Sequence, residues 1–411
     1  MPRALLLIPT TSYRAQAFLE AARRLSVEIT VGSDEPNVLS ASNPSGYLMI
    51  SKVDISETIT AVRQFHQNYL LDAIIGVDDQ SVVLAARISE ALSLPHNSVA
   101  SVSAARNKHI MRERFKQAGV PQPLYDLFSI DNDLNVIAAR ITYPCVVKPL
   151  TLSASRGVIR ANNEAEFIAA FQRVMKIVQM PDIAKDDSMQ KLLVEEYISG
   201  TEVAVEGLLS KGKLRVLAIF DKPDSLEGPF FEETIYVTPS RLPMDNQRKI
   251  AVCVQQATKA LGLEEGPIHA ELRINEQGFW VLEIAARSIG GYCSRSIRCT
   301  NGREQVSLEE LILRQALGME TYSFQREPQA AGVMMMPIPR AGVLQEVNGL
   351  QSAKGVSHIE DVIISIPIGQ QVVPLPEGSR YLGFIFARAH RPNDVEKALR
   401  EAHAQLQFEV K

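Results

Sequence analysis

The amino-acid sequence predicts a multidomain protein that combines α/β and α+β architecture. Three observations predict it: βαβ alternation in the first hundred residues, paired strand patterns around short turns in the middle, and proline-punctuated short strands from about residue 325. Alternating strands and helices are typical of a mostly parallel sheet covered by helices. The 411 residues would suffice for about two to four domains.

The N-terminal segment, residues 1–105, is expected to form a Rossmann-like α/β domain. Apolar runs predict strands at 4–8, 27–31 and 72–77, and periodic patterns predict helices at 15–25 and 81–92. The first turn, residues 9–12, lacks the GxGxxG fingerprint, so a dinucleotide is not the expected ligand. Asp78 and Asp79 follow a strand at the edge where such sheets bind ligands. Either residue could equally cap the helix that follows.

The middle region, residues 106–325, mixes helices with antiparallel strand signals. Helices are expected at 108–118, 164–175 and 247–261, and strands at 144–149, 192–198, 202–209 and 214–221. The charged stretch 182–188 is expected to be an exposed loop. After residue 325 the predicted elements change to short strands, at 333–337 and 362–366, and an amphipathic helix at 393–407. That change predicts a separate small α+β domain at 326–411.

Composition excludes several functional classes. The formal charge of −4 is spread over residues of both signs, which argues against nucleic acid as a partner because binding it needs a basic patch. The four cysteines form no CxxC pair, so zinc and disulfides are not expected. The apolar run at 4–9 is too short for a signal peptide or a membrane span. We therefore expect a cytoplasmic protein that does not bind membranes.

Two carboxylates on neighbouring strand-like runs are the most informative chemical feature. Glu271 and Glu283 lie on these runs, and Arg287 follows four residues after the second carboxylate. Carboxylates held close together repel each other unless a cation lies between them. Hard oxygen ligands of this kind suit Mg²⁺, which also takes nucleotide phosphate oxygens. The alternative is a surface hairpin with ordinary charges.

Cations and a small-residue loop precede this pair in the sequence. Lys108 and Lys148 are compact cations suited to phosphate oxygens, and the loop 153–157 could fold backbone N–H groups over a phosphate chain. The run 195–198 ends where a strand edge could pair with adenine. No GxxxxGK[ST] P-loop is present. Taken singly, each feature has a plain alternative, such as a solvated lysine or an ordinary hairpin.

Taken in order, these motifs resemble the ATP-grasp superfamily of carboxylate–amine (or carboxylate–thiol) ligases. The resemblance covers nearly the whole chain, and residues 380–389 look like the C-terminal domain of the L-amino-acid ligase branch, which makes dipeptides or amino-acid conjugates. It implies an ATP-grasp fold with three parts. These are a pre-ATP-grasp domain at 1–105, an ATP-grasp domain at 106–325 with a lid at about 145–205, and a C-terminal α+β domain at 326–411.

The resemblance also implies a role for individual residues. It places two lysines at the ATP phosphates, Lys148 within reach of the adenine as well, and the lid loop over the phosphates. It gives adenine backbone contacts from two residues and assigns the ribose hydroxyls to a carboxylate. The residues are Lys108 and Lys148 at the phosphates; Ser153, Ser155 and Gly157 in the lid loop; Glu195 and Ile198 at the adenine; and Glu202 at the ribose.

For metal and catalysis, the resemblance implies that Glu271 and Glu283 bridge Mg²⁺, with Mn²⁺ as a second option. Arg287 would steady the transferred phosphoryl group or the acyl phosphate. Many ATP-grasp enzymes have Asn two residues after the second glutamate, where this chain has Ala285. An alanine cannot ligate a metal, so water or substrate would complete the metal shell.

Several further residues are candidates for catalysis or for binding the substrates. Lys222 could meet phosphate, and Glu232 or Glu233 could pair with an amino group, although all three could be solvated loop charges. Gly290 and Gly291 break the chain before Arg295 and Arg298, which could bind a substrate carboxylate. His269 shares the face of Glu271 on an alternating strand, and a packed core histidine is the alternative.

The sequence therefore predicts an ATP-dependent ligase that joins a carboxylate to an amine, with an amino acid as one partner. The reaction would pass through an acyl phosphate and release ADP and phosphate. An ATP-grasp carboxylase of the purine-pathway or biotin-carboxylase type is one alternative, and a non-catalytic nucleotide-binding protein is another. The expected partners are ATP and small carboxylate and amine substrates, with a homodimer as an expectation from the family.

Overall fold

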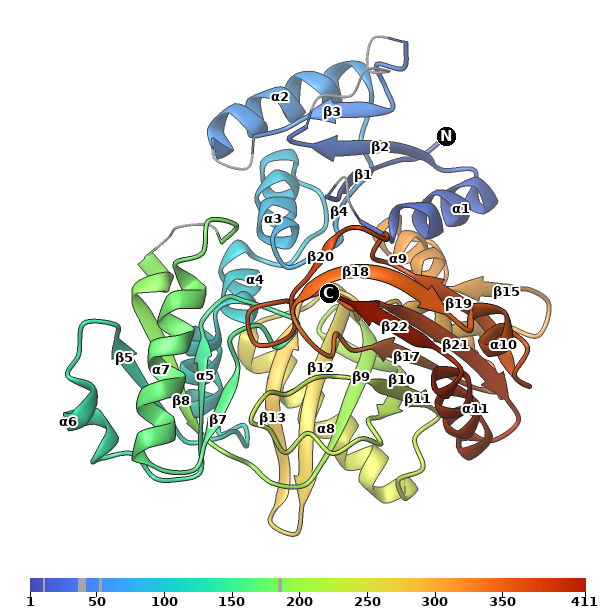
Figure 1. The fold of residues 1–411 in the computed structure, drawn as a ribbon. Helices are drawn as coiled ribbons and strands as arrows, with labels where there is room; N and C mark the ends of the chain where they lie inside the picture. Colours follow the sequence, from blue (N-terminus) through green and yellow to red (C-terminus); the bar gives the residue numbers. More distant parts are fainter. Residues whose placement is uncertain (10–11, 36–41, 52–53, 184–186) are drawn as a thin grey trace.

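The computed structural model describes residues 1–9, 12–35, 42–51, 54–183 and 187–411 (Figure 1). The expected first turn at 9–12 and the expected loop at 182–188 lie partly outside these residues. Within the described helices, none is both long and apolar enough to cross a membrane.

The N-terminal part is a four-stranded parallel sheet in the order β3-β2-β1-β4. Its strand β1 is buried along its whole length, as an apolar run between two covering layers must be. The helices α1 and α3 begin and end at the expected residues. The elements are β1 (Arg3–Leu7), α1 (Ala15–Leu25), β2 (Glu28–Ser33), β3 (Tyr47–Met49), α2 (Ile55–Asn68), β4 (Ala73–Gly76) and α3 (Ser81–Leu92).

Two helices link this part to a second sheet that lies apart from the rest, on the left in Figure 1. This sheet is antiparallel, in the order β5-β8-β6-β7, and α7 packs on it through an apolar face that includes Phe167 and Phe171. We call it the lid. The elements are α4 (Val99–Arg106), α5 (Lys108–Ala118), β5 (Tyr125–Ser129), α6 (Leu134–Ala138), β6 (Cys145–Pro149), β7 (Ile159–Ala161), α7 (Glu164–Val178) and β8 (Lys191–Glu196).

The lid begins earlier than the sequence predicted. Strand β5 pairs with β8 along its whole length, from Tyr125 opposite Glu195 to Ser129 opposite Lys191. The expected start near residue 145 missed this strand because β5 is only partly buried and has an acidic residue, Asp126, near its start. Its alternation of apolar and polar residues is therefore weak.

The largest sheet has eight strands in the order β13-β12-β9-β10-β11-β17-β21-β19. Strand β9 is buried on both faces: Val203 and Val205 join one hydrophobic cluster, and Ala204 and Leu208 join another. Near the start of β9, Glu202 lines the cavity described below. The strands are β9 (Thr201–Ser210), β10 (Lys213–Asp221), β11 (Ile235–Thr238), β12 (Gly266–Asn275), β13 (Gly278–Ala285), β17 (Ala330–Met336), β19 (Ile359–Ile364) and β21 (Gly383–Ala389).

This sheet runs across the expected boundary at residue 325. Strand β11 pairs with β10 on one side and with β17 on the other, so the C-terminal strands extend the central sheet. The C-terminal strands β17, β19 and β21 therefore share the central sheet with strands of the middle region. The physical reason is backbone pairing: all four residues of β11 pair with β17, whereas only Val237 also pairs with β10.

The remaining elements cover the central sheet or complete its ends. Helix α8 packs on the face that also contacts α5, with Ile250 and Val254 in the shared cluster. The expected helix at 393–407 is α11, and the chain ends in a strand, β22, that pairs with β18 and was not expected. The elements are α8 (Met244–Leu261), β14 (Arg298–Thr300), β15 (Gln305–Ser307), α9 (Leu308–Ala316), β16 (Gln325–Arg326), β18 (Gly342–Asn348), α10 (Leu350–Lys354), β20 (Gln371–Val372), α11 (Pro392–Ala404) and β22 (Gln407–Val410).

Candidate active site

A cavity of about 770 Å³ lies where the N-terminal sheet, the lid, the central sheet and the C-terminal segment meet. Alternation along β12 explains which side chains reach it. His269, Glu271 and Arg273 line the cavity, whereas the residues between them, Ala270 and Leu272, are buried in a hydrophobic cluster on the other face. The structure therefore places His269 and Glu271 on one face, as the sequence predicted.

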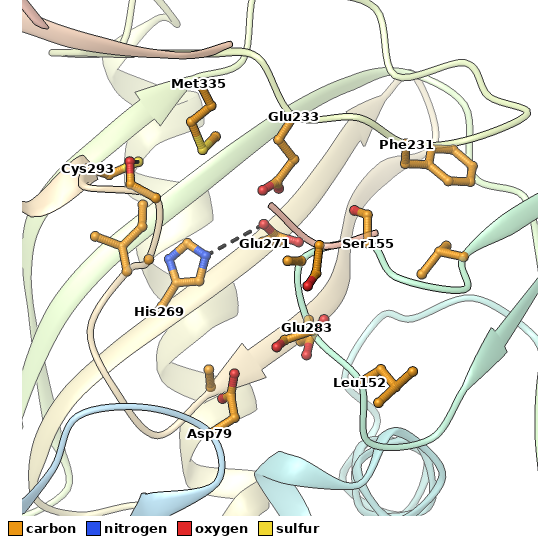
Figure 2. Close-up of a pocket in the computed structure, with 18 of the residues that line it drawn as sticks. Asp79, Leu152, Ser155, Phe231, Glu233, His269, Glu271, Glu283, Cys293 and Met335 are labelled. Carbon is orange, nitrogen blue, oxygen red and sulfur yellow. Dashed lines mark hydrogen bonds and ion pairs between the residues drawn. The ribbon is translucent and has the colours of Figure 1, made fainter. Parts of the chain in front are cut away.

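The two carboxylates expected to hold metal lie opposite each other. Glu271 on β12 pairs with Glu283 on β13, immediately before a bulge in the register, and both side chains line the cavity (Figure 2). The Nζ atom of Lys108 lies 3.1 Å from a carboxylate oxygen of Glu283. The pair offers hard oxygen ligands on a rigid support. These residues therefore fit a magnesium ion.

Lys222 lies behind this pair rather than in the cavity. Its Nζ atom donates hydrogen bonds to Glu202 at 2.7 Å, Glu233 at 2.6 Å and Glu271 at 2.9 Å. An ammonium group has three donors, so all of them are used. Lys222 is buried and is absent from the described residues that line the cavity. The expected contact of Lys222 with phosphate would require it to leave these carboxylates.

The same cluster shifts the pKa values of its carboxyl groups in opposite directions. Burial and the nearby Glu271 raise the pKa of Glu233 to about 7, although Lys222 opposes the rise. Burial would also raise the pKa of Glu271, but Lys222 and His269 hold it well below its ordinary value. Oxygens of Glu202, Glu233 and Glu271 lie within 4.8 Å of one another. The ammonium group of Lys222 is the cation that makes this arrangement stable.

Lys148 and Glu195 form a second buried ion pair at the lid. The Nζ atom of Lys148 is 2.6 Å from one oxygen of Glu195, and Nε of Arg112 is 2.7 Å from the other. Burial would raise the pKa of Glu195, but the two cations bring it to about 2. Because Glu195 lies between β5 and β6 in the sheet, its main chain takes part in strand pairing. The structure thus shows a role for its side chain in holding Lys148, which the sequence did not predict.

Ile198 lies just past the end of β8 and lines the cavity. Its carbonyl oxygen accepts a hydrogen bond from Arg273 at 2.6 Å, whereas its N–H finds no partner among the described residues. Val146 and Leu282 also line this part of the cavity. Apolar walls with one free backbone donor suit a flat heteroaromatic base. Nearby, both oxygens of Glu202 are occupied, by Lys222 and by Arg273 at 3.0 Å.

Arg287 binds a carboxylate from the N-terminal sheet. Its Nε and one terminal nitrogen donate to the two oxygens of Asp79, at 2.8 and 2.7 Å. Burial would raise the pKa of Asp79, but Arg287 lowers it. The neighbouring Asp78 has the other role that the sequence left open, since it accepts the N–H groups of Gln80 and Ser81 where α3 begins.

The lid turn between β6 and β7 carries the predicted phosphate-loop residues. Ser153 and Ser155 line the cavity, whereas Gly157 is not among its lining residues. Ala154, Ser155 and Gly157 all have positive φ angles, of 54°, 54° and 74°. The N–H of Gly157 donates to the carbonyl of Pro376 at 3.0 Å. The turn therefore touches the loop between β20 and β21.

His269 lies between two carboxylates. Its Nε2 lies 3.5 Å from an oxygen of Glu271, and its Nδ1 lies 3.8 Å from an oxygen of Glu206. Glu206 is fully buried, burial raises its pKa well above the ordinary value, and it accepts the N–H of Ile289 at 2.9 Å. Sequence reasoning missed Glu206. The available signal was an acidic residue on an otherwise apolar stretch of β9.

Of the predicted substrate residues, Glu233, His269, Gly290 and Gly291 line the cavity. Arg295 does not: it pairs with Asp361 at 3.2 Å and lies over the ring of Phe386 at 3.9 Å. Arg298 likewise pairs with Glu360. A short 3₁₀ helix after Gly291, Cys293–Ser296, takes these arginines toward β19 and away from the cavity. The structure therefore gives no support to Arg295 as a ligand of the substrate.

A group of aromatic rings on the cavity wall was also missed. Tyr13 stacks on Tyr292 with ring centres 4.0 Å apart, and Tyr292 meets Phe384 at 4.8 Å. These rings come from the N-terminal turn, the Gly290–Gly291 turn and β21. Their meeting is long-range, so no local pattern in the sequence could reveal it.

Comparisons with known proteins agree with this architecture. The ATP-grasp N-terminal domain matches residues 19–96, the ATP-grasp domain matches 141–296, and the L-amino acid ligase C-terminal domain 2 matches 334–411. A solved L-amino acid ligase from Bacillus licheniformis superposes with a TM-score of 0.83 at 26% identity, over 100% of this chain and 99% of that chain.

Two curated relatives match over a smaller share of both chains than the solved ligase does. Alanine–anticapsin ligase of Bacillus subtilis is 27% identical over 60% of this chain and 54% of its own length. Dapdiamide A synthase of Enterobacter agglomerans is 26% identical over 68% of this chain and 66% of its own length. The chain thus spans about half to two thirds of these relatives.

The fold, the paired carboxylates and the matched domains together define an ATP-grasp fold, and the chain carries the ATP-grasp N-terminal domain and the ATP-grasp domain. It also carries the C-terminal domain of L-amino acid ligases. The expected fold class and the expected resemblance to the L-amino-acid ligase branch are therefore confirmed.

Proposed function

We propose that the protein is an ATP-dependent ligase that joins the carboxylate of one substrate to the amine of another, with an amino acid as one partner. The observation that carries this proposal is the pair Glu271 and Glu283, facing each other at the cavity beside Lys108 and Arg287. This is the arrangement that phosphoryl transfer requires, because the reaction depends on positioning and on neutralisation of charge.

The proposed reaction has two steps. A carboxylate oxygen attacks the γ-phosphorus of ATP, the bond to the β–γ bridging oxygen breaks, and ADP leaves. The amine then attacks the acyl carbon, phosphate leaves with the electron pair of the C–O bond, and the amine loses one proton. The products are an amide, ADP and phosphate. A magnesium ion held by Glu271 and Glu283 would neutralise charge on the phosphate oxygens.

Different residues of the chain would have separate roles in this reaction. Lys108 and Lys148 would bind phosphate oxygens, and Ile198 would offer its free N–H to the base. Arg287, fixed by Asp79, would face the charge that develops on the transferred group. The lid turn at 153–157 would exclude water from the acyl phosphate, which water would otherwise hydrolyse.

The first experiment measures ADP and phosphate release with ATP and Mg²⁺ against pairwise mixtures of the amino acids. Release that needs both an acid and an amine, together with the matching amide in mass spectrometry, would support the proposal. Release that needs bicarbonate would favour an ATP-grasp carboxylase. Nucleotide binding without release for any mixture would contradict a ligase of amino acids and favour a non-catalytic protein.

A further inference from the structure

The ion pairs around the cavity differ in their balance of charge. The pair Arg287–Asp79, for example, joins one cation to one carboxylate at 2.7 Å. At the lid, by contrast, two cations share one carboxylate: Glu195 lies 2.7 Å from Nε of Arg112 and 2.6 Å from Nζ of Lys148. We call these three residues the lid cluster. The cluster has one positive charge more than its carboxylate can neutralise.

The two cations of the lid cluster differ in their access to the cavity. Arg112 is fully buried and is absent from the described residues that line the cavity. Lys148 lines the cavity, and its side chain is 11% exposed. An ammonium group has three donors, and the contact with Glu195 occupies one of them. The excess charge of the cluster therefore reaches the cavity through Lys148.

Arg112 is held in place independently of Lys148. One of its terminal nitrogens donates a hydrogen bond to the carbonyl of Leu282 at 2.7 Å. Leu282 lies at the bulge of β13, directly before Glu283. The main-chain carbonyl of Arg112 also accepts a hydrogen bond from the side chain of Gln122 at 2.9 Å. Arg112 is thus fixed between α5 and β13, so it stays beside the lid carboxylate whatever Lys148 binds.

The extra cation matters because Glu195 is buried. A buried carboxylate is costly unless a cation lies beside it. If Lys148 were the sole cation in the cluster, its one charge would have to neutralise both Glu195 and an incoming phosphate group. The two negative groups would also repel each other more strongly than they would in water. With Arg112 neutralising the carboxylate, the charge of Lys148 is available to an anion in the cavity.

We propose that Arg112 is a positioning residue for nucleotide binding: it neutralises Glu195 and so leaves the charge of Lys148 available to the phosphate chain of ATP. This inference rests on the proposed binding of ATP phosphates by Lys148. It adds a residue that acts on the nucleotide without touching it. The effect is on the phosphates, so the binding of the base should not depend on the charge of Arg112.

The test measures the binding of two ligands by calorimetry in the presence of Mg²⁺. One is AMP-PNP, a non-hydrolysable analogue of ATP, and the other is adenosine, which has no phosphate and is measured by competition. The variant Arg112→Gln removes the charge but keeps a hydrogen-bond donor. We expect it to raise the Kd of AMP-PNP by about tenfold or more and to leave the Kd of adenosine unchanged. A distorted site would weaken both ligands.

Two further variants test the charge directly. Arg112→Lys keeps a positive charge and should retain most of the affinity for AMP-PNP. The double variant Arg112→Gln/Glu195→Gln removes the carboxylate together with its cation. It should regain most of the affinity that Arg112→Gln loses, because Lys148 then has no carboxylate to neutralise.

Arg114→Gln is the matched control. Arg114 lies on the same helix, α5, and donates to the backbone carbonyl of Leu261 at 3.0 Å. Neither residue is among the described residues that line the cavity. The control removes an arginine contact of a similar kind, and it should bind AMP-PNP like the wild type. Thermal unfolding of each variant checks that the fold is intact.

The outcomes separate this inference from the function on which it rests. Equal weakening of AMP-PNP and adenosine in Arg112→Gln, or no recovery in the double variant, would overturn it. If Arg112→Gln does not fold, Arg112→Lys and the double variant decide, and a loss of about tenfold in both would overturn the inference. The measurements need no turnover, so a failure to form any amide would contradict the ligase proposal alone. No binding of AMP-PNP to the wild-type protein would overturn both.

Discussion

Arg287 at the end of β13 donates two parallel hydrogen bonds to Asp79, which lies 208 residues earlier, at the turn that follows β4. The pair ties the N-terminal sheet to the strand that carries Glu283. A bidentate contact fixes both the position and the plane of a guanidinium group. The N-terminal part of the chain therefore helps to position a residue proposed to act in phosphoryl transfer.

The substitution Asp79→Asn should lower kcat for ADP release by about 10–100-fold, because a misplaced catalytic group is costly even at small displacements. Arg287→Ala should lower it by about 100–1000-fold. The double variant should be no worse than Arg287→Ala alone, since Asp79 acts through Arg287. Glu90→Gln, at an exposed position of α3, is the control. Additive losses in the double variant would contradict this coupling.

The variants Glu271→Gln and Glu283→Gln should each lower ADP release by about 100-fold or more, because each removes a charge that holds the metal. Titration of Mg²⁺ should show a weaker apparent affinity in both. Glu276→Gln changes an exposed residue in the turn between the same two strands. It should change neither ADP release nor the apparent affinity for Mg²⁺. Wild-type release in either site variant would disprove the metal assignment.

The variant Lys222→Met should lower the free energy of unfolding by about 3–5 kcal/mol, because it leaves the buried carboxylate cluster without its cation. Addition of Mg²⁺ should recover part of that loss if the ion binds the freed carboxylates in the folded state. Chemical denaturation with and without Mg²⁺ measures both effects. Lys213→Met, at an exposed position of β10, should unfold like the wild type. An equally small effect of Lys222→Met would contradict the role of Lys222 as a structural cation.

The stabilising effect of Glu195 should depend on pH. Because its pKa is about 2 in the folded protein against an ordinary value of 4.5, its contribution to stability is present above pH 4.5 and decreases as the pH falls toward 2. The difference in unfolding free energy between wild type and Glu195→Gln should thus be largest near neutral pH and shrink below about 4.5. Glu264→Gln, at an exposed position, should show no such trend. A constant difference across this range would contradict the ion-pair explanation.

Local patterns in the sequence were sufficient for many of the elements. Helices α1 and α3 have apolar periodicity and clear ends, and their bounds agree with the prediction. The paired strands that carry Glu271 and Glu283 could also be predicted locally, because the short turn between them fixes which residues face each other. Strand β22 was missed because it is short and half exposed, so it depends on β18 and not on its own sequence.

Contacts between distant segments explain the rest of the differences. The sequence could name Asp79 and Arg287 separately but could not show that they meet. It predicted that Arg295 binds a substrate carboxylate because arginine suits a planar anion, whereas Asp361 and Phe386 hold it elsewhere.

The continuity of the central sheet through β11 and β17 also affects how this protein can change during evolution. A chain cut between them would expose two unpaired strand edges, which favour aggregation. An exchange of C-terminal segments between relatives at that point would have to preserve the register between Ile235 and Met334. Single substitutions in the loops around the cavity are therefore easier to accommodate than recombination of whole segments at that point.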